Sequence, residues 1–132
     1  MTTETEQANL ELIRKRFLEH PILGKPDSVI REVYSPDVVL HGQGEQFKGW
    51  DGIVEAAQQT LDAFSDVTFD IESMQANGDR VITRIRGTSR HTGEFHGVPP
   101  SGKEVNLSGM VTSLIRDGKI VEEWRSLDWD LH

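Results

Sequence analysis

The sequence contains no cysteine among its 132 residues. Disulfides, zinc–thiolate sites and cysteine nucleophiles are therefore excluded. No apolar run approaches the length that a bilayer-spanning helix needs. The first twelve residues are acidic and polar, and they lack the basic and apolar segments of a signal peptide. We therefore expect a soluble, cytoplasmic protein.

Basic residues are also scarce. Fourteen Lys and Arg stand against 22 Asp and Glu, which gives a formal net charge of -8. Nucleic acids and anionic membranes attract proteins through basic surfaces, so we expect neither as a partner. The length fits a single domain over residues 1–132, and a chain of this size can build a core that surrounds a pocket.

Apolar residues recur at helical spacing in three segments of the first half of the chain. These segments are residues 5–20, a short stretch after Asp27, and residues 49–64. Asp27 is suited to cap the second helix. A short strand over residues 38–40 leads to His41, and the segment that follows it, up to Gly49, is expected to be a loop.

From residue 67 the apolar period changes to two, which is typical of half-buried strands. Strands are expected over residues 67–72, 80–88, 105–115 and 120–129. Asn77-Gly78 and Asp117-Gly118 are strong hairpin signals. Helices followed by an antiparallel meander predict an α+β fold in which the helices cover one face of a curved sheet.

The last expected strand has apolar residues on both faces. Regular alternation puts Ile120 and Trp124 on one side, with Val121, Leu127 and Trp129 on the other. A sheet that is apolar on both faces needs a second cover. We therefore expect a homodimer that packs sheet against sheet.

Motifs spread along nearly the whole chain resemble those of one known family. They are Val38 to Gly44 with Gly49, Ala76 to Val81, Gly87-Thr88, His91 to Phe95, Gly97 to Lys103, and Asp117 to Trp124 with Asp128 four residues on. Their order and spacing are similar to those of SnoaL-like polyketide cyclases, a family of the nuclear-transport-factor-2-like superfamily.

This resemblance implies a cone-shaped α+β barrel, in which a curved, mostly antiparallel sheet wraps around the N-terminal helices. It also implies a deep apolar pocket. Well-characterised members close a ring in polyketide biosynthesis by an intramolecular aldol condensation, with no metal and no organic cofactor. An aspartate near the end of the last strand acts as their general acid/base, and the matching residue here is Asp128.

Asp128 is the first candidate for catalysis. A free aspartate has a pKa near 3.9 and is a weak base, but burial among apolar groups raises that value. Trp124 lies four residues earlier, on the same face of a regular strand, and would form part of an apolar wall. The alternative is a solvated aspartate near the C-terminus.

Two histidines complete the predicted catalytic group. His41 ends a short apolar strand before a glycine-containing loop, where the pocket mouth is expected. It would hydrogen-bond a carbonyl or enolate oxygen or shuttle a proton, unless it only bonds the backbone. His91 would border the pocket or brace the loop, and His96 is expected to be structural. The loop spacing of His91 and His96 does not fix metal-ligand geometry, so no metal site is expected.

Substrate contacts are assigned to five further residues: Trp124, Arg86, Phe95, Met110 and Trp50. An inward Arg86 would stabilise an oxyanion. The outward orientation is favoured, because Val81, Thr83 and Ile85 form the better core face of that strand. For Trp50, at the start of a helix, core packing is the alternative.

Two classes of function follow. In the favoured one, an enzyme without cofactors abstracts a proton from an activated carbon of a small apolar carbonyl compound and cyclises or isomerises it. Steroid isomerase-like or epoxide hydrolase-like chemistry is the alternative within enzymes. In the second class, the same fold is a non-catalytic small-molecule-binding or association module. The strand over residues 105–116 carries no histidine, a departure from the best-known cyclases that leaves room for a different substrate.

Overall fold

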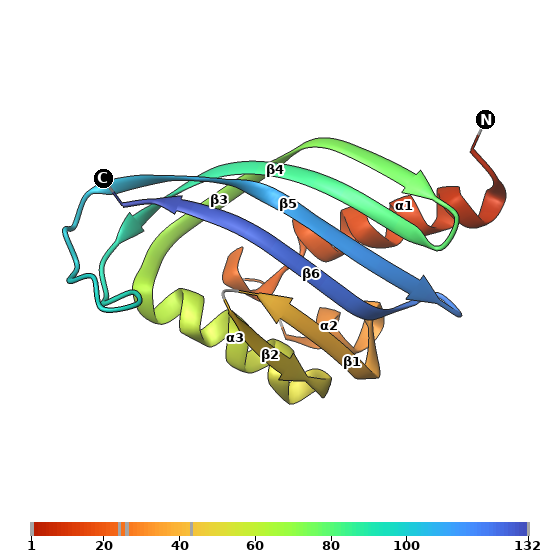
Figure 1. Cartoon of the computed structure of the whole chain (residues 1–132), viewed down its shortest axis with the longest axis horizontal. Helices are drawn as coiled ribbons and strands as arrows, with labels where there is room; N and C mark the ends of the chain where they lie inside the picture. The colour runs from red at the N-terminus through yellow and green to blue at the C-terminus, as the bar shows by residue number, and fades with distance from the viewer. Residues whose placement is uncertain (1, 24, 26, 43, 132) are drawn as a thin grey trace.

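The computed structural model describes residues 2–23, 25, 27–42 and 44–131. Six strands form one sheet in the order β2-β1-β6-β5-β4-β3. β1 runs parallel to β6, and every other neighbouring pair is antiparallel. The sheet is strongly curved but not closed, with β2 and β3 at its edges (Figure 1). In chain order the elements are α1 (Glu4–Leu18), η1 (Pro21–Leu23), α2 (Ser28–Val33), β1 (Tyr34–Gly42), β2 (Glu45–Lys48), α3 (Gly49–Ala63), β3 (Phe64–Asn77), β4 (Arg80–His91), β5 (Glu104–Arg116) and β6 (Lys119–Asp130).

The helices cover the concave face of this sheet (Figure 1). A capping box between Thr3 and Glu6 starts α1. This helix buries Ile13 and Phe17, and the Phe17 ring meets Phe69 of β3 edge-on at 5.9 Å. α3 buries a face that includes Ile53 and packs against β1, β2 and β3. The core therefore lies between the helices and the concave face, which confirms the predicted α+β class.

Bulges and glycines allow the sheet to bend. The β3–β4 register shifts twice, and Asp66 at the first shift has a φ of 52°. A Cβ at Gly87 would collide with the carbonyl oxygen of Thr68 on β3. A Cβ at Gly109 would collide with the carbonyl oxygen of Ser126 on β6. The strands approach each other this closely only because these positions have no side chain.

A further bulge decides which side chains of β6 face inward. Ile115 pairs with Ile120 and Leu114 with Glu122, so Val121 is an extra residue. The prediction that Ile120 and Trp124 share a face is therefore wrong, because one inserted residue inverts the alternation of the strand. Beyond the bulge the concave face carries Glu123, Arg125, Leu127 and Trp129, and the convex face carries Glu122, Trp124, Ser126 and Asp128.

The segment expected to be a loop before Gly49 contains the short strand β2, which pairs with β1. Four residues are too few to show a period of two. β1 begins at Tyr34, directly after α2, so the helix ends earlier than Pro36, where the sequence predicted its end. β3 likewise begins at Phe64, the last residue expected in the third helix.

Candidate functional site

An internal cavity of about 30 Å³ lies between the helices and the concave face. Most of its lining is apolar and includes Phe17, Phe69 and Leu107. A second cavity, also about 30 Å³, is lined by Leu40 and Phe47 among others. The two cavities share three lining residues, which are Thr60, Arg125 and Leu127. Each has room for about two water molecules or one small polar group.

A buried carboxylate, Glu123, stands at the centre of a charged cluster beside these cavities. Arg16 of α1 donates two hydrogen bonds to it, from Nε to Oε1 at 3.0 Å and from Nη2 to Oε2 at 2.9 Å. Arg125 Nε donates to Oε2 at 2.8 Å, and the Tyr34 hydroxyl donates at 3.1 Å. Glu123 has no exposed surface and Arg16 only 4%. The cluster ties α1 and β1 to β6.

The cluster keeps Glu123 ionised. Burial on its own would raise the pKa of this carboxyl, but Arg16 and Arg125 outweigh that effect and lower the pKa from 4.5 to about 2. Burial is also the main reason why the pKa of the Tyr34 hydroxyl is raised. Glu123 is therefore a fixed negative charge and not a proton acceptor at neutral pH.

His20 follows α1 and lines the first cavity. Burial, together with the nearby charges of Arg16 and Arg125, holds the pKa of His20 well below 6.5, so the ring is neutral. The backbone N–H of Ile22 donates to its Nδ1 at 3.2 Å. The proton of the neutral ring therefore sits on Nε2, which makes Nε2 a hydrogen-bond donor.

Three buried donors that line the first cavity have no hydrogen-bond partner in the described part of the chain: His20 Nε2, Arg125 Nη2 and Trp129 Nε1. They come from the end of α1 and from the concave face of β6. Buried polar atoms are normally paired. Unpartnered donors on three residues that line one cavity make it the candidate place for a ligand oxygen atom.

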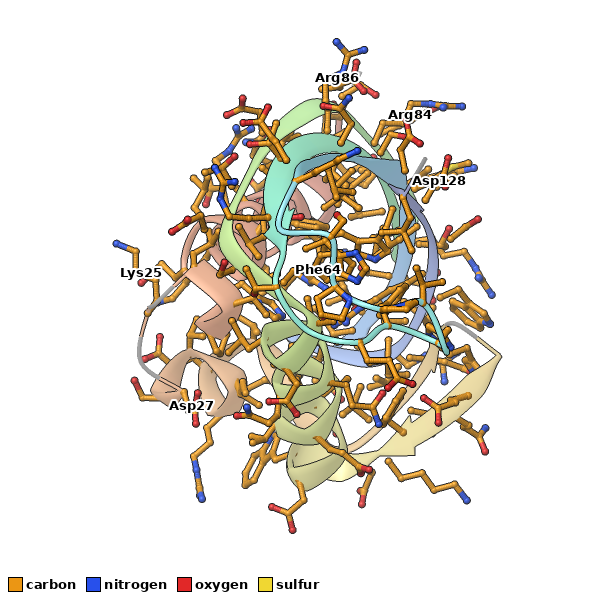
Figure 2. All side chains as sticks on the ribbon, turned by 90° about the vertical axis from the view of Figure 1, so that its left-hand side faces the viewer. Lys25, Asp27, Phe64, Arg84, Arg86 and Asp128 are labelled. Carbon is orange, nitrogen blue, oxygen red and sulfur yellow. The ribbon has the colours of Figure 1, made fainter. Side chains whose placement is uncertain are left out.

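Most of the predicted site residues lie on the opposite face of the sheet. Asp128 is exposed on the convex face, as Figure 2 shows together with Arg84 and Arg86. Arg86 pairs there with Glu72 at 3.3 Å. Met110 and Trp124 are half-buried and also convex. The placement of Asp128 in the pocket is corrected for the same reason as that of Trp124: the bulge in β6 turns both away from the cavities.

His41 lies at the edge of the site. Its Nε2 is 2.7 Å from Glu122 Oε2, and its ring stacks on Trp124 with centroids 5.6 Å apart. It borders an open surface groove that shares Gly42 and Arg125 with the lining of the second cavity. The side-chain partner of His41 is a carboxylate, and its place at a pocket mouth stays a prediction.

His91, Phe95 and Trp50 have packing contacts. His91 is buried against Phe64, and its backbone holds both Gly102 and Lys103 of the loop. Phe95 contacts Phe64 at 4.9 Å and the cavity-lining Trp129 at 6.3 Å between ring centroids. Figure 2 shows Phe64 inside the curve of the sheet. Trp50 Nε1 donates to the Tyr34 carbonyl at 2.8 Å, so it braces the start of β1.

Sequence reasoning missed Arg16, His20, Glu123 and Arg125. A signal for the first two exists, since Arg16 and His20 follow Ile13 by three and seven residues and continue its apolar stripe. For Glu123 and Arg125 the alternation of β6 gave no such signal, because the bulge is not visible in the sequence.

The described residues contain no group of three or more His, Asp or Glu side chains arranged to hold a metal ion. Within the same residues, no helix has both the length and the apolar character needed to cross a membrane.

Comparisons with known proteins agree on the family. The sequence profile of SnoaL-like polyketide cyclases matches residues 14–129. IdmH from Streptomyces antibioticus, a proposed polyketide cyclase, is 28% identical with a TM-score of 0.75, over 91% of each chain. AclR from Streptomyces galilaeus, a proposed hydroxylase, is 28% identical with a TM-score of 0.71, over 97% of this chain and 81% of its own.

A proposed SnoaL-like polyketide cyclase from Jannaschia sp. CCS1 has a TM-score of 0.86 over 97% of this chain and 90% of its own. Its 23% identity shows a shared fold alone. A search of curated proteins gives no match.

Proposed function

The chain belongs to the SnoaL-like polyketide cyclase family, and we propose that its internal cavity binds the carbonyl group of a small apolar compound and that the protein promotes proton transfer next to that group. IdmH, a proposed polyketide cyclase of similar fold, supports a reaction of this kind. The observation that carries the proposal is the set of three unpartnered donors, His20 Nε2, Arg125 Nη2 and Trp129 Nε1.

The donors suit an oxygen atom that becomes negative. When a proton leaves the carbon beside a carbonyl, the electron pair of the C–H bond moves to the oxygen and forms an enolate. Fixed donors in a water-poor cavity stabilise that charge more than they stabilise the neutral carbonyl. A neutral histidine whose lowered pKa keeps it a donor is a known way to polarise a carbonyl.

No described side chain is assigned as the proton acceptor, and the proton is proposed to pass to solvent. His41 stacks on Trp124 and pairs with Glu122 on the convex side, and it lines neither cavity. Glu123 is unsuitable because its pKa is about 2. Asp128 lies on the convex face, away from both cavities.

Indole N–H signals in a ¹H–¹⁵N NMR spectrum test binding, with pentane-2,4-dione as the probe. The Trp129 signal should move on titration. The Trp50 signal should stay, because that N–H already donates to Tyr34, and the Trp124 signal should stay because its ring is convex. A shift of Trp124 alone, or of none of the three, would contradict binding in the cavity.

Deuterium uptake by the same compound in D₂O tests catalysis. The protein should speed exchange at the central carbon. Trp129→Phe should lower that rate at least about tenfold. Asp128→Asn should leave it unchanged. Loss of exchange in Asp128→Asn would restore that residue as the base, and binding without any exchange would indicate a carrier.

A further inference from the structure

We infer that the ligand of this cavity carries a carboxylate group, which Arg125 binds, so that the substrate class is a small apolar oxo-acid. This inference rests on the proposed function and adds the charge of the substrate to it. It starts from the hydrogen-bonding of Arg125, which differs from that of Arg16. Arg16 uses two nitrogens on Glu123, whereas Arg125 uses only Nε.

Nη2 of Arg125 is buried and is available to bind a ligand. The side chain is 12% exposed, and Nη2 has no hydrogen-bond partner within the described residues. A guanidinium can bind two acceptors side by side. Because Glu123 occupies Nε of Arg125, a second carboxylate can bind the Nη2 that Glu123 leaves unused. Arg125 also lines both cavities and therefore stands where they adjoin.

The charge balance of the cluster favours an anion. Arg16 and Arg125 are positive and Glu123 is negative, which leaves one positive charge in excess. His20 is neutral and adds no charge. In the part of the chain that the structure describes, no Asp or Glu lines either cavity. A buried charge without a counterion is costly, and an anionic ligand would supply the counterion.

The polar atoms left without partners beside the cavity also favour an anion over a neutral ligand or water. Arg125 Nη2 can only donate, and it is the donor assigned to the carboxylate, whereas His20 Nε2–H and Trp129 Nε1–H are left for the carbonyl oxygen of the proposed function. Water must place its own two hydrogens as well as accept, while a carboxylate only accepts. A carboxylate is also small enough for a cavity of about 30 Å³.

A matched pair of probes tests the inference. 3-Oxobutanoate and pentane-2,4-dione share the carbonyl and the activated methylene, and they differ in having a carboxylate or an acetyl group at the other end. Dissociation constants are measured from the Trp129 indole shift. The acid should bind at least about tenfold more tightly than the diketone, because a hydrogen bond between two charged groups is stronger than one to a neutral carbonyl.

Arg125→Gln should remove that preference, so that the two dissociation constants come within about threefold of each other. Arg84→Gln is the matched control, because it removes the same charge from the exposed convex face. It should leave the preference as in the unaltered protein. If Arg125→Gln does not fold, the comparison of the two probes on the unaltered protein still decides the question.

The outcomes separate this inference from the proposed function. Tighter binding of the acid together with deuterium exchange supports both. Tighter binding of the acid without exchange keeps the carboxylate site and removes the proton-transfer chemistry. If the diketone binds as tightly as the acid or more tightly, the carboxylate inference is overturned and the proposed carbonyl site remains. A Trp129 signal that neither probe moves overturns both.

Discussion

Glu123 has no exposed surface, and a lone carboxylate in such a place would take up a proton instead of staying charged. It remains charged because Arg16 and Arg125 lie on it and Tyr34 donates to it. Each arginine in turn depends on the carboxylate, since its own burial would be costly without a counterion. The three charges form one unit, in which both arginines depend on a single carboxylate.

Glu123→Gln should lower the free energy of unfolding by about 3–5 kcal/mol, because it leaves two buried guanidinium groups without a counterion. Urea denaturation measures the loss. Glu122→Gln is the matched control on the neighbouring residue, whose side chain is 34% exposed, and it should cost less than about 1 kcal/mol. Equal losses in the two variants would mean that the buried cluster has no special weight.

His20 should make stability depend on pH. Its pKa is lowered in the folded protein, so below pH 6.5 the unfolded chain binds a proton that the folded chain does not. Stability therefore falls as pH falls, by up to about 1.4 kcal/mol per pH unit for one proton. Urea denaturation from pH 7 to 5 should show this slope, and His20→Gln should flatten it. Parallel profiles for the two proteins would contradict a buried neutral His20.

Glu123 adds a second decline at lower pH. Its folded pKa of about 2 lies below the ordinary 4.5, so its contribution is present above pH 4.5 and is lost as pH falls towards 2. The His20 decline begins near pH 6.5 and the Glu123 decline only below pH 4.5, so their onsets distinguish the two groups.

At this scale the sequence predicts residue types better than their directions. The better core face of β4 predicts an outward Arg86, and Arg86 is exposed. Asp128 and Trp124 were expected to share a face, and they do, but that face is convex. Family resemblance and alternation predict the strand and the fact that these two side chains share one of its faces. Neither could show the inserted Val121 that turns them away from the core.

Among the elements, β4 and β5 carry the curvature that encloses the cavities. Gly87 and Gly109 lie on these strands where neighbouring backbones come too close for a Cβ. Ile85, two residues from Gly87, pairs with Gly109, so the two glycines are near neighbours in the sheet. The curved sheet therefore requires residues without side chains at Gly87 and Gly109.

Gly87→Ala should lower the free energy of unfolding by more than about 2 kcal/mol, because the new methyl group would meet the Thr68 carbonyl and the Phe69 backbone. Gly42→Ala is the control, since its added Cβ would make an ordinary contact of 3.6 Å with Arg125 Cβ. Thermal or urea denaturation compares them. A Gly87→Ala protein as stable as Gly42→Ala would show that the sheet can flatten there.

The long elements were predictable because each has many periods of its pattern. α1, α3, β4, β5 and both hairpin turns follow directly from spacing and from the Asn-Gly and Asp-Gly signals. The short β2 and the early start of β1 were not, since their form depends on pairing with each other and with β6. Pairing between distant segments leaves no local periodicity to detect.

At the scale of the whole molecule, the convex face of the sheet carries apolar side chains that the proposed function does not explain. Ile82, Thr112 and Trp124 form a row across β4, β5 and β6. Met110 lies in the next row, between Arg84 and Ser126. The row places Ile82 and Trp124 on a face that no helix of the described residues covers (Figure 1). A second copy of the chain, packed sheet to sheet, remains our prediction for what covers it.

Ile82→Glu tests the dimer within that row. Ile82 is 36% exposed, so a charge there should be tolerated by the isolated chain but not by a dry interface. Leu61→Glu is matched to it, because Leu61 is 39% exposed and lies on α3. Light scattering should give a dimer for the unaltered protein and for Leu61→Glu, and a monomer for Ile82→Glu. An unaltered protein that is monomeric at working concentration would leave the convex face in solvent, and its apolar row would then need another partner.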